Sequence, residues 1–252
     1  MKTIFITGAT SGIGKSCANI FAKDGNNLII TGRRKERLLK LKEELESKFN
    51  IKVLTLNFDV RNKDEVKQAI SNLDNEWSNI DILINNAGLA VGLNKIQDGE
   101  IDDWERMIDT NIKGLLYITR AISPLMTEKK SGHIINIGSV AGKETYPFGN
   151  VYCATKHAVD SLSKAMRIDM VEFGIKVTQI APGAVETEFS NVRFKGDDTK
   201  ADSIYNGFEP LRPEDIADAV FYCANLPKHV NINDMLIMPT AQASAGIIHK
   251  KL

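Results

Sequence analysis

Hydrophobic residues along the chain fall into two alternating patterns. Seven short runs are almost continuously apolar, as expected for strands that are covered on both faces. These runs are TIFIT (3–7), NLIIT (27–31), KVLTLNF (52–58), DILIN (81–85), HIINIG (133–138), KVTQIA (176–181) and MLIMP (235–239). Between them lie longer segments with the three- and four-residue apolar spacing of an amphipathic helix. The alternation predicts right-handed βαβ units and an α/β fold, a doubly wound parallel seven-stranded sheet with helices on both faces.

One helical segment and one long loop complete this outline. In residues 33–49, Leu38, Leu41 and Leu45 recur on one face, and the charges on the other face are those of a solvated helix surface. From about 183 to 212 the chain carries little strong periodicity, and loops of this length are usually functional lids or disordered. We therefore expect one domain over residues 1–252, with a substrate lid at approximately 183–212.

Composition and charge exclude several functional classes. Hydrophobic residues make up 43% and charged residues 25%, ordinary values for a globular protein in water. Thirty-two basic and 32 acidic side chains cancel, so no basic surface for nucleic acid stands out. No stretch approaches a membrane span, and the N-terminus lacks the features of a signal peptide. The three cysteines fit a reducing cytoplasm, and with the four histidines they form no metal-ligand spacing, so we expect no metal, membrane or nucleic-acid partner.

A glycine-rich loop follows the first predicted strand in TGATSGIG. Gly8, Gly12 and Gly14 permit a tight turn, a close approach to a pyrophosphate, and close packing of the next helix on the strand. That helix would also present free N–H groups to the anion. A plain strand-to-helix turn can need glycine as well, but its place after the first strand favours a dinucleotide site. The other candidate contacts in this loop are Thr10, Ser11 and Ile13.

The end of the second predicted strand, TGRR, indicates which dinucleotide is bound. An acidic residue here would bind the ribose 2′-hydroxyl of NAD, whereas arginine accommodates the 2′-phosphate of NADP. This chain has Arg33 and Arg34 and no carboxylate at this point. Two surface arginines that merely begin a helix are the weaker alternative, because positive charge there opposes the helix dipole. We therefore expect NADP(H) as the cofactor.

Tyr152 and Lys156 stand four residues apart in NVYCATKHAV. In a helix, positions i and i+4 share one face, so the ammonium would lie beside the phenol. A nearby positive charge favours the phenolate and lowers the pKa of the phenol from about 10 towards the neutral range. The spacing is common by chance, so a solvated lysine beside a half-buried tyrosine is the alternative to an acid–base pair.

Four further motifs appear in order along the chain: LNFDV around Asp59, NNAG (85–88), TNIKG around Asn111 and IGSVAG around Ser139. Together with TGATSGIG, YCATK and APGAV (181–185), they resemble the motifs of the classical short-chain dehydrogenase/reductases. Each motif alone is weak, but seven in the correct order at plausible spacing are specific. The resemblance implies a single-domain Rossmann fold.

The resemblance also implies a role for each motif residue. Tyr152 would be the general acid/base, Lys156 would lower its pKa and hold the nicotinamide ribose, and Ser139 would orient the substrate oxygen. Asn111 would hold a water behind the lysine in a proton relay. From the residues alone, Ser139 could be an ordinary turn serine, and Asn111 a buried helical asparagine with a water or backbone partner. Beside Tyr152 and Lys156, the cofactor contacts implied are Asp59, Val60, Asn86, Gly88, Pro182, Gly183 and Val185.

Segments outside these motifs narrow the resemblance. TEFSNVRFKGDD (187–198), PEDIADAV, LPKHVNIN and TAQASAG resemble the NADP-dependent 3-hydroxy acid dehydrogenases, which include serine and allo-threonine dehydrogenases. This implies hydride transfer between NADP(H) and the 3-hydroxyl or 3-oxo carbon of short acids such as serine, allo-threonine and 3-hydroxypropionate. Arg193 and Lys195 are the nearest basic candidates for the substrate carboxylate. We expect Arg193 to bind this carboxylate, while Ser139 and Tyr152 contact the substrate as well. The alternative is that Arg193 is a solvated charge on the lid.

The same resemblance implies an oligomeric assembly, and two alternative functions stay open. The family commonly forms tetramers through paired long helices, here those holding Asn111 and Tyr152, so a homotetramer is expected. A reductase of 3-oxoacyl thioesters or small ketones would use the same catalytic residues on another substrate. A non-catalytic NADP-binding protein would keep the cofactor loop but would not need all four catalytic residues.

Overall fold

The structure is built on one parallel sheet. The computed structural model describes residues 1–251. Its strands are β1 (Thr3–Ile6), β2 (Asn27–Gly32), β3 (Val53–Asn57), β4 (Ile82–Asn85), β5 (Gly132–Ile137), β6 (Ile175–Pro182) and β7 (Asp234–Ile237). They lie in the order β3-β2-β1-β4-β5-β6-β7, and every neighbouring pair is parallel. The predicted doubly wound sheet is confirmed, with strand ends within two residues of the apolar runs.

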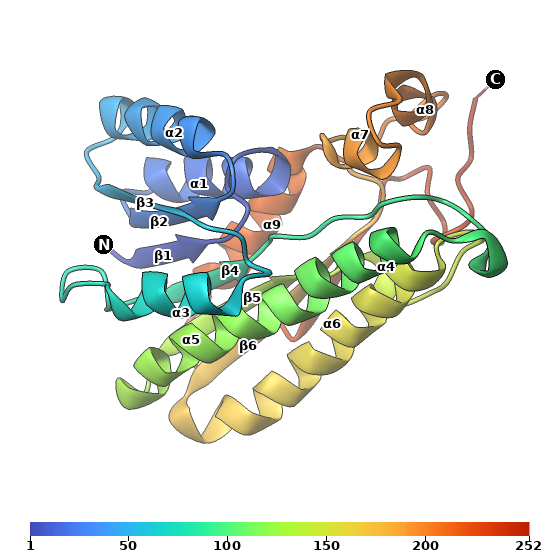
Figure 1. Cartoon of the computed structure of the whole chain (residues 1–252). Coiled ribbons are helices and arrows are strands. Elements are labelled where there is room, and N and C mark those ends of the chain that lie inside the picture. The colour runs from blue at the N-terminus through green and yellow to red at the C-terminus, as the bar shows by residue number, and fades with distance from the viewer. Residues whose placement is uncertain (252) are drawn as a thin grey trace.

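Helices cover both faces of this sheet (Figure 1). One layer holds α1 (Gly12–Lys23), α2 (Lys35–Lys48) and α9 (Pro213–Ala224). The opposite layer holds α3 (Lys63–Ser71), α4 (Ile101–Ile108), α5 (Leu115–Glu128) and α6 (Asn150–Met170). Shorter turns are η1 (Ile96–Asp98), η2 (Asp109–Gly114), η3 (Val140–Gly142) and η4 (Val171–Phe173). The predicted helix over residues 33–49 is α2, and its leucine stripe is buried as expected.

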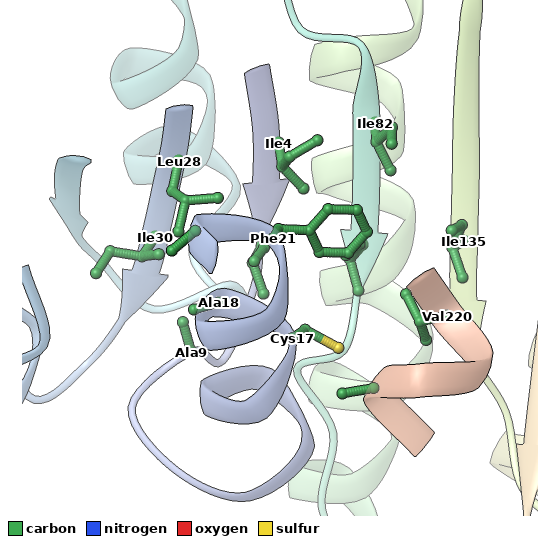
Figure 2. Close-up of a cluster of buried hydrophobic side chains, with 14 of the residues drawn as sticks. Ile4, Ala9, Cys17, Ala18, Phe21, Leu28, Ile30, Ile82, Ile135 and Val220 are labelled. Carbon is green, nitrogen blue, oxygen red and sulfur yellow. The ribbon is translucent and has the colours of Figure 1, made fainter. Parts of the chain in front are cut away.

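Alternate residues of each strand supply the two cores. Ile4 of β1 faces the layer of α1 and α9, whereas the next residue, Phe5, faces the opposite layer, as the two-residue period of a strand requires. Figure 2 shows part of the first core, where Phe21 of α1 and Val220 of α9 lie over the sheet in the same cluster as Ile4. Full burial of such a side chain contributes about 1.5–3 kcal/mol. This packing fixes the strand ends, where the functional residues lie.

The segment around Asn111 departs from the predicted continuous helix. Between α4 and α5 the chain forms a π-helical turn, η2, and Asn111 lies within it. Such a turn inserts one extra residue and is frequent at functional sites. Gly114 closes the turn against Val60, where an added Cβ would lie only 2.8 Å from Val60 Cγ2. Helix propensity does not report such a turn, nor the close approach of Gly114 to a distant loop.

The predicted lid forms short helices of its own. It contains α7 (Phe189–Arg193) and α8 (Asp198–Ser203), which Figure 1 places near the C-terminus. A bridge between Val185 and Leu211 joins its two ends. The C-terminal segment also reaches the lid, where the Lys251 N–H donates to Gly207 O at 2.7 Å. Within residues 1–251 no helix combines the length and apolarity needed to cross a membrane.

Candidate active site

A cleft lies at the carboxyl ends of the strands, where the loops after β1 to β6 converge. In open α/β sheets this is the edge at which ligands bind, where the connections diverge to opposite faces. Most residues predicted from the motifs line it: Gly8, Thr10, Ser11, Gly12, Ile13, Arg33, Arg34, Asp59, Val60, Asn86, Gly88, Ser139, Tyr152, Lys156, Pro182, Gly183 and Val185. Gly14, Asn111 and Arg193 lie immediately beyond this lining and contact it.

The glycine loop after β1 has the form that a pyrophosphate requires. Gly8 and Gly12 have φ of 66° and 51°, a region that favours glycine. A Cβ on Gly14 would lie 2.4 Å from Gly8 O, so α1 can pack this closely only with glycine there. Ser11 precedes α1 without capping it, and the first turn carries no acidic side chain. The N–H groups of this turn are therefore available to a phosphate, and the loop fits a dinucleotide.

Asn86 supports the glycine loop from β4. Its Nδ2 donates to Thr7 O at 2.9 Å and to Gly8 O at 3.1 Å. Thr7 Oγ1 accepts in return from the backbone N–H groups of Asn86 and Ala87, both at 2.9 Å. The side chain thus lines the cleft and also holds the cofactor loop in shape. Its predicted contact with the ribose remains a prediction.

Tyr152 and Lys156 lie on α6 and face the cleft together. They are only 9% and 6% exposed, which rules out the solvated-lysine alternative. Lys156 Nζ donates to Ile137 O at 2.9 Å, and an ammonium has three N–H groups. Two donors therefore remain for the hydroxyls of a ribose. Burial lowers the pKa of Lys156 to about 8.

The pKa of Tyr152 moves the other way from the prediction. Burial is the largest influence and raises the pKa, and the neighbouring Tyr146 raises it further. Arg193 and a hydrogen bond with Ser139 lower it, but they do not compensate for burial. In the protein alone the pKa of Tyr152 is therefore not lowered as predicted. Desolvation of the phenolate, which a sequence does not display, outweighs the nearby charges.

Ser139 has two roles at the end of β5. Its Oγ accepts from the Ala141 N–H at 3.1 Å and so caps the turn η3. This is the role of an ordinary turn serine that the sequence left open. The same hydroxyl lies close enough to Tyr152 to lower the pKa of its phenol. The geometry therefore places a hydroxyl beside the phenol, where both can reach one oxygen of a substrate.

Asn111 lies behind the lysine, but its side chain is committed to the protein. Its Oδ1 accepts from the Leu89 N–H at 2.9 Å, and its Nδ2 donates to Leu89 O at 2.8 Å and Thr155 Oγ1 at 3.0 Å. A Cβ on Gly88 would lie 3.3 Å from Asn111 Oδ1 and 3.6 Å from Lys156 Nζ. Asn111 thus holds the Leu89 loop and α6 together beside the site. The relay water stays a prediction.

Arg193 lies among aromatic rings at the substrate end of the cleft. Its guanidinium carbon is 5.0 Å from the Tyr152 ring centroid, 5.5 Å from that of Phe189 and 5.8 Å from that of Tyr146. Its Nη2 donates to Tyr146 Oη at 2.6 Å. Its Nε is buried and has no hydrogen-bond partner among the residues described. A buried N–H without a partner is costly, so this group is suited to an anionic ligand.

Lys195, the other basic candidate, is engaged elsewhere. Its ammonium lies 2.8 Å from Asp103 Oδ2 on α4, and that carboxylate belongs to a largely buried residue. The backbone carbonyl of Arg193 accepts from the Gly92 N–H at 3.0 Å on the same side. These contacts fix the end of α7 against α4. Between the two candidates, the structure therefore favours Arg193 for the carboxylate.

Several residues of the site were not predicted. The cleft is also lined by Gly32, Phe58, Ala87, Leu89, Thr110, Ile137, Gly138, Thr187, Glu188, Phe189 and Val192. Tyr146 contacts Arg193 but lies in a loop without a motif. An aromatic residue between Ser139 and Tyr152 was the available signal for it. No sequence signal distinguished Glu188 from the other charged residues of the lid.

Replacement of Lys156 with methionine should stabilise the fold at neutral pH. Because burial depresses the lysine pKa from 10.5 to about 8, the unfolded chain holds a proton that the folded chain releases between these values. This difference in pKa lowers the free energy of unfolding by its full amount below pH 8 and by less and less as the pH rises to 10.5. Removal of the lysine should therefore stabilise the fold by up to about 3 kcal/mol, less about 1 kcal/mol for the lost hydrogen bond.

Urea unfolding at pH 7 and pH 10 measures this effect. The gain of Lys156→Met over the wild type should be largest at pH 7 and small at pH 10. Lys164→Met, which changes an exposed lysine on the same helix, is the matched control and should show no such trend. An equal difference for Lys156→Met at both pH values would contradict the depressed pKa.

A parallel sheet in this order, with a glycine cradle after its first strand and a buried Tyr–Lys pair, defines the class as a dinucleotide-dependent oxidoreductase fold. The chain belongs to the short-chain dehydrogenase family, whose model matches residues 2–198. This confirms the resemblance identified from the seven motifs.

Similar proteins extend over almost the whole chain. An NADP-dependent 3-hydroxy acid dehydrogenase of Escherichia coli O6:H1 is 49% identical over 250 residues, covering 98% of this chain and 99% of the relative. A sulfoacetaldehyde reductase of Chromohalobacter salexigens is 45% identical, covering 95% of each chain. A closed form of serine dehydrogenase complexed with NADP+ superposes with a TM-score of 0.92 at 48% identity, covering 99% of this chain and 100% of the other.

Proposed function

We propose that this protein is an NADP-dependent dehydrogenase of short 3-hydroxy acids. The observation that carries the proposal is Arg193, whose guanidinium lies 5.0 Å from the Tyr152 ring and keeps a buried Nε without a protein partner. Two carbon atoms separate the carboxylate of a 3-hydroxy acid from its reacting hydroxyl. An acid of this length can therefore reach the arginine and the tyrosine at once. The 3-hydroxy acid dehydrogenase and serine dehydrogenase relatives support the same substrate class.

Each residue of the site has its own role in the proposed reaction. Bound NADP would supply the hydride chemistry at C3 of the substrate. In oxidation, Tyr152 as phenolate takes the proton of the substrate hydroxyl, and in reduction it returns that proton to the carbonyl oxygen. Ser139 hydrogen-bonds the same oxygen and orients it. Lys156 would hold the ribose hydroxyls of the cofactor, while Arg193 would bind the carboxylate and so orient C3 of the acid.

The raised pKa of Tyr152 is compatible with this role. Phenolate formation is disfavoured by burial in the chain alone. The nicotinamide ring of NADP+ carries a positive charge, and a positive charge in a buried site lowers the pKa of a neighbouring acid. We infer that the tyrosine becomes an effective base in the oxidative direction only with the oxidised cofactor beside it.

Absorbance at the reduced-nicotinamide band tests the proposed function. Purified protein would receive NADP+ or NAD+ with L-serine, D-serine, allo-threonine, 3-hydroxypropionate, 3-hydroxyisobutyrate or a simple secondary alcohol. Turnover of the acids with NADP+ and little with NAD+ is the expected result. Turnover of only the plain alcohol would reject the substrate class while keeping the catalytic residues.

Reverse assays separate the remaining candidates. NADPH would be offered with malonic semialdehyde, sulfoacetaldehyde, a small ketone or a 3-oxoacyl thioester. The sulfonate is included because a relative at 45% identity is a sulfoacetaldehyde reductase and a guanidinium binds either anion. Oxidation of no alcohol and reduction of no carbonyl, with tight NADPH binding, would favour the non-catalytic binder.

We also propose a cytoplasmic homotetramer. Large apolar side chains are exposed on the outer sides of the paired long helices, among them Ile108 on α4, Leu116 on α5 and Ile168 on α6. The last of these is 75% exposed, and a partner subunit that packs on these helices would cover it. The three free, buried cysteines fit a reducing compartment. Sedimentation of the purified protein tests the assembly, and a monomer at micromolar concentration would contradict it.

A further inference from the structure

An acidic residue of the lid occupies arginines at the other end of the cofactor cleft. Glu188, immediately before α7, accepts a hydrogen bond from Arg34 Nη1 at 2.9 Å and another from Arg37 Nη1 at 2.8 Å. Arg34 follows β2, at the position where arginine accommodates the 2′-phosphate of NADP. The contact therefore links two segments that are 154 residues apart, across the mouth of the cleft.

The other donors of Arg34 are already directed into the glycine loop. Its Nη2 donates to Thr10 Oγ1 at 2.8 Å and to Ser11 Oγ at 3.0 Å. Glu188 thus holds the remaining Nη1 edge of Arg34. Arg33 is held less firmly, because its guanidinium lies 3.8 Å from Asp59, beyond hydrogen-bond distance. A phosphate can approach Arg33 freely, but it competes with Glu188 for Arg34.

The chemistry of the two anions makes this competition direct. Carboxylates and phosphates bind guanidinium groups through the same charge-assisted hydrogen bonds. Two anions that share the same arginines repel each other, so one excludes the other. The side chains of Glu188, Arg34 and Arg37 are 43–49% exposed, and exposed ion pairs are weak. A phosphate dianion, with more charge and more oxygens, can displace the carboxylate.

We propose that Glu188 is a placeholder for the 2′-phosphate of NADP: it occupies Arg34 and Arg37 until the phosphate binds and displaces it from them. Displacement frees the start of α7, the helix that carries Phe189 and Arg193 at the substrate end. The phosphate at one end of the cofactor is thereby coupled to the lid at the other. Glu188 also becomes a specificity residue, because only a phosphorylated dinucleotide must compete with it. The inference rests on the NADP preference and not on the identity of the substrate.

Binding of the reduced cofactors without substrate tests the competition. Nicotinamide fluorescence would be titrated with NADPH and with NADH for the wild type and Glu188→Gln at low salt. The variant should bind NADPH about three- to ten-fold more tightly, the range expected when the two exposed competing ion pairs with Arg34 and Arg37 are lost, and NADH within two-fold of the wild type. Glu186→Gln removes an equal charge from the same exposed loop and should change neither.

Two results of this titration would overturn the proposal. Unchanged or weaker NADPH binding by Glu188→Gln would show that the carboxylate does not compete with the phosphate. Equal tightening for NADPH and NADH would show that the effect does not arise at the 2′-phosphate. Neither result depends on turnover, so a failed substrate assay leaves the test intact.

Hydrogen exchange of the lid tests the coupling. Adenosine 2′,5′-bisphosphate and adenosine 5′-monophosphate differ only in the 2′-phosphate, and both leave the nicotinamide end free. At saturation, the bisphosphate should speed exchange of the amides at 187–193 in the wild type, whereas the monophosphate should not. In Glu188→Gln these amides should exchange fast without either ligand. Equal exchange with the two nucleotides in the wild type would overturn the link to the lid.

Discussion

Replacement of Tyr152 with phenylalanine should reduce kcat by at least about 100-fold while sparing NADPH binding, because a positioned general acid/base typically contributes 10²–10⁴-fold. The change removes one hydroxyl and keeps the ring. That ring packs edge-on against Phe189 with centroids 5.6 Å apart, so the fold of the site should persist. Initial rates by nicotinamide absorbance and NADPH binding by fluorescence measure the two effects separately.

A matched tyrosine provides the control for this prediction. Tyr146 also contacts Arg193 and also lies beside the site, but the proposed mechanism gives its hydroxyl no proton to transfer. Tyr146→Phe should therefore retain substantial kcat. Tyr152→Phe that keeps more than a few per cent of the wild-type rate would refute the acid/base role.

Replacement of Arg193 with methionine should raise KM for 3-hydroxy acids by about 10- to 100-fold, the loss expected for one or two charge-assisted hydrogen bonds to a carboxylate. Methionine retains much of the apolar stem that packs among the three aromatic rings. The proton-transfer residues are untouched, so kcat should fall less than kcat/KM. Steady-state kinetics with serine and 3-hydroxypropionate give both constants.

Two comparisons distinguish carboxylate binding from general damage to the lid. Lys195→Met removes the neighbouring basic residue, whose ammonium already pairs with Asp103, and should leave KM for the acids near the wild-type value. A secondary alcohol without a carboxylate should be oxidised equally well with or without Arg193. An unchanged KM for the acids in Arg193→Met would reject this residue as the carboxylate partner.

Much of the fold was predictable because its signals are local. Strands covered on both faces leave continuous apolar runs, and all the runs proposed became strands. The glycine loop, Ser139 and Tyr152 were also predictable as one site, because parallel strands bring their carboxyl ends to the same edge. The i, i+4 spacing of Tyr152 and Lys156 placed them correctly on one helix face.

The rest depends on contacts between distant segments. The π-helical turn at Asn111 includes Gly114, which packs closely on Val60, and propensity reports neither feature. The pKa of Tyr152 is set mainly by burial, and the depth of burial is known only once the lid is folded over the site. Arg193 and Lys195 look equivalent along the chain.

The Asp103 contact of Lys195 and the aromatic surroundings of Arg193 separate those two basic residues. Glu188 likewise looks like an ordinary lid charge until the fold brings it to Arg34. Local patterns therefore predict the chemistry of the site, whereas its charge balance and substrate end require the three-dimensional structure.

The origin of the transferred hydride tests most directly whether the enzyme dehydrogenates its substrate at the 3-hydroxyl. L-Serine deuterated at C3 would be oxidised with NADP+, and the NADPH formed would be analysed by mass spectrometry. Dehydrogenation at the 3-hydroxyl predicts one deuterium per NADPH from this substrate and none from serine deuterated at C2. NADPH without deuterium from the C3-labelled acid, or with deuterium from the C2-labelled acid, would contradict dehydrogenation at the 3-hydroxyl.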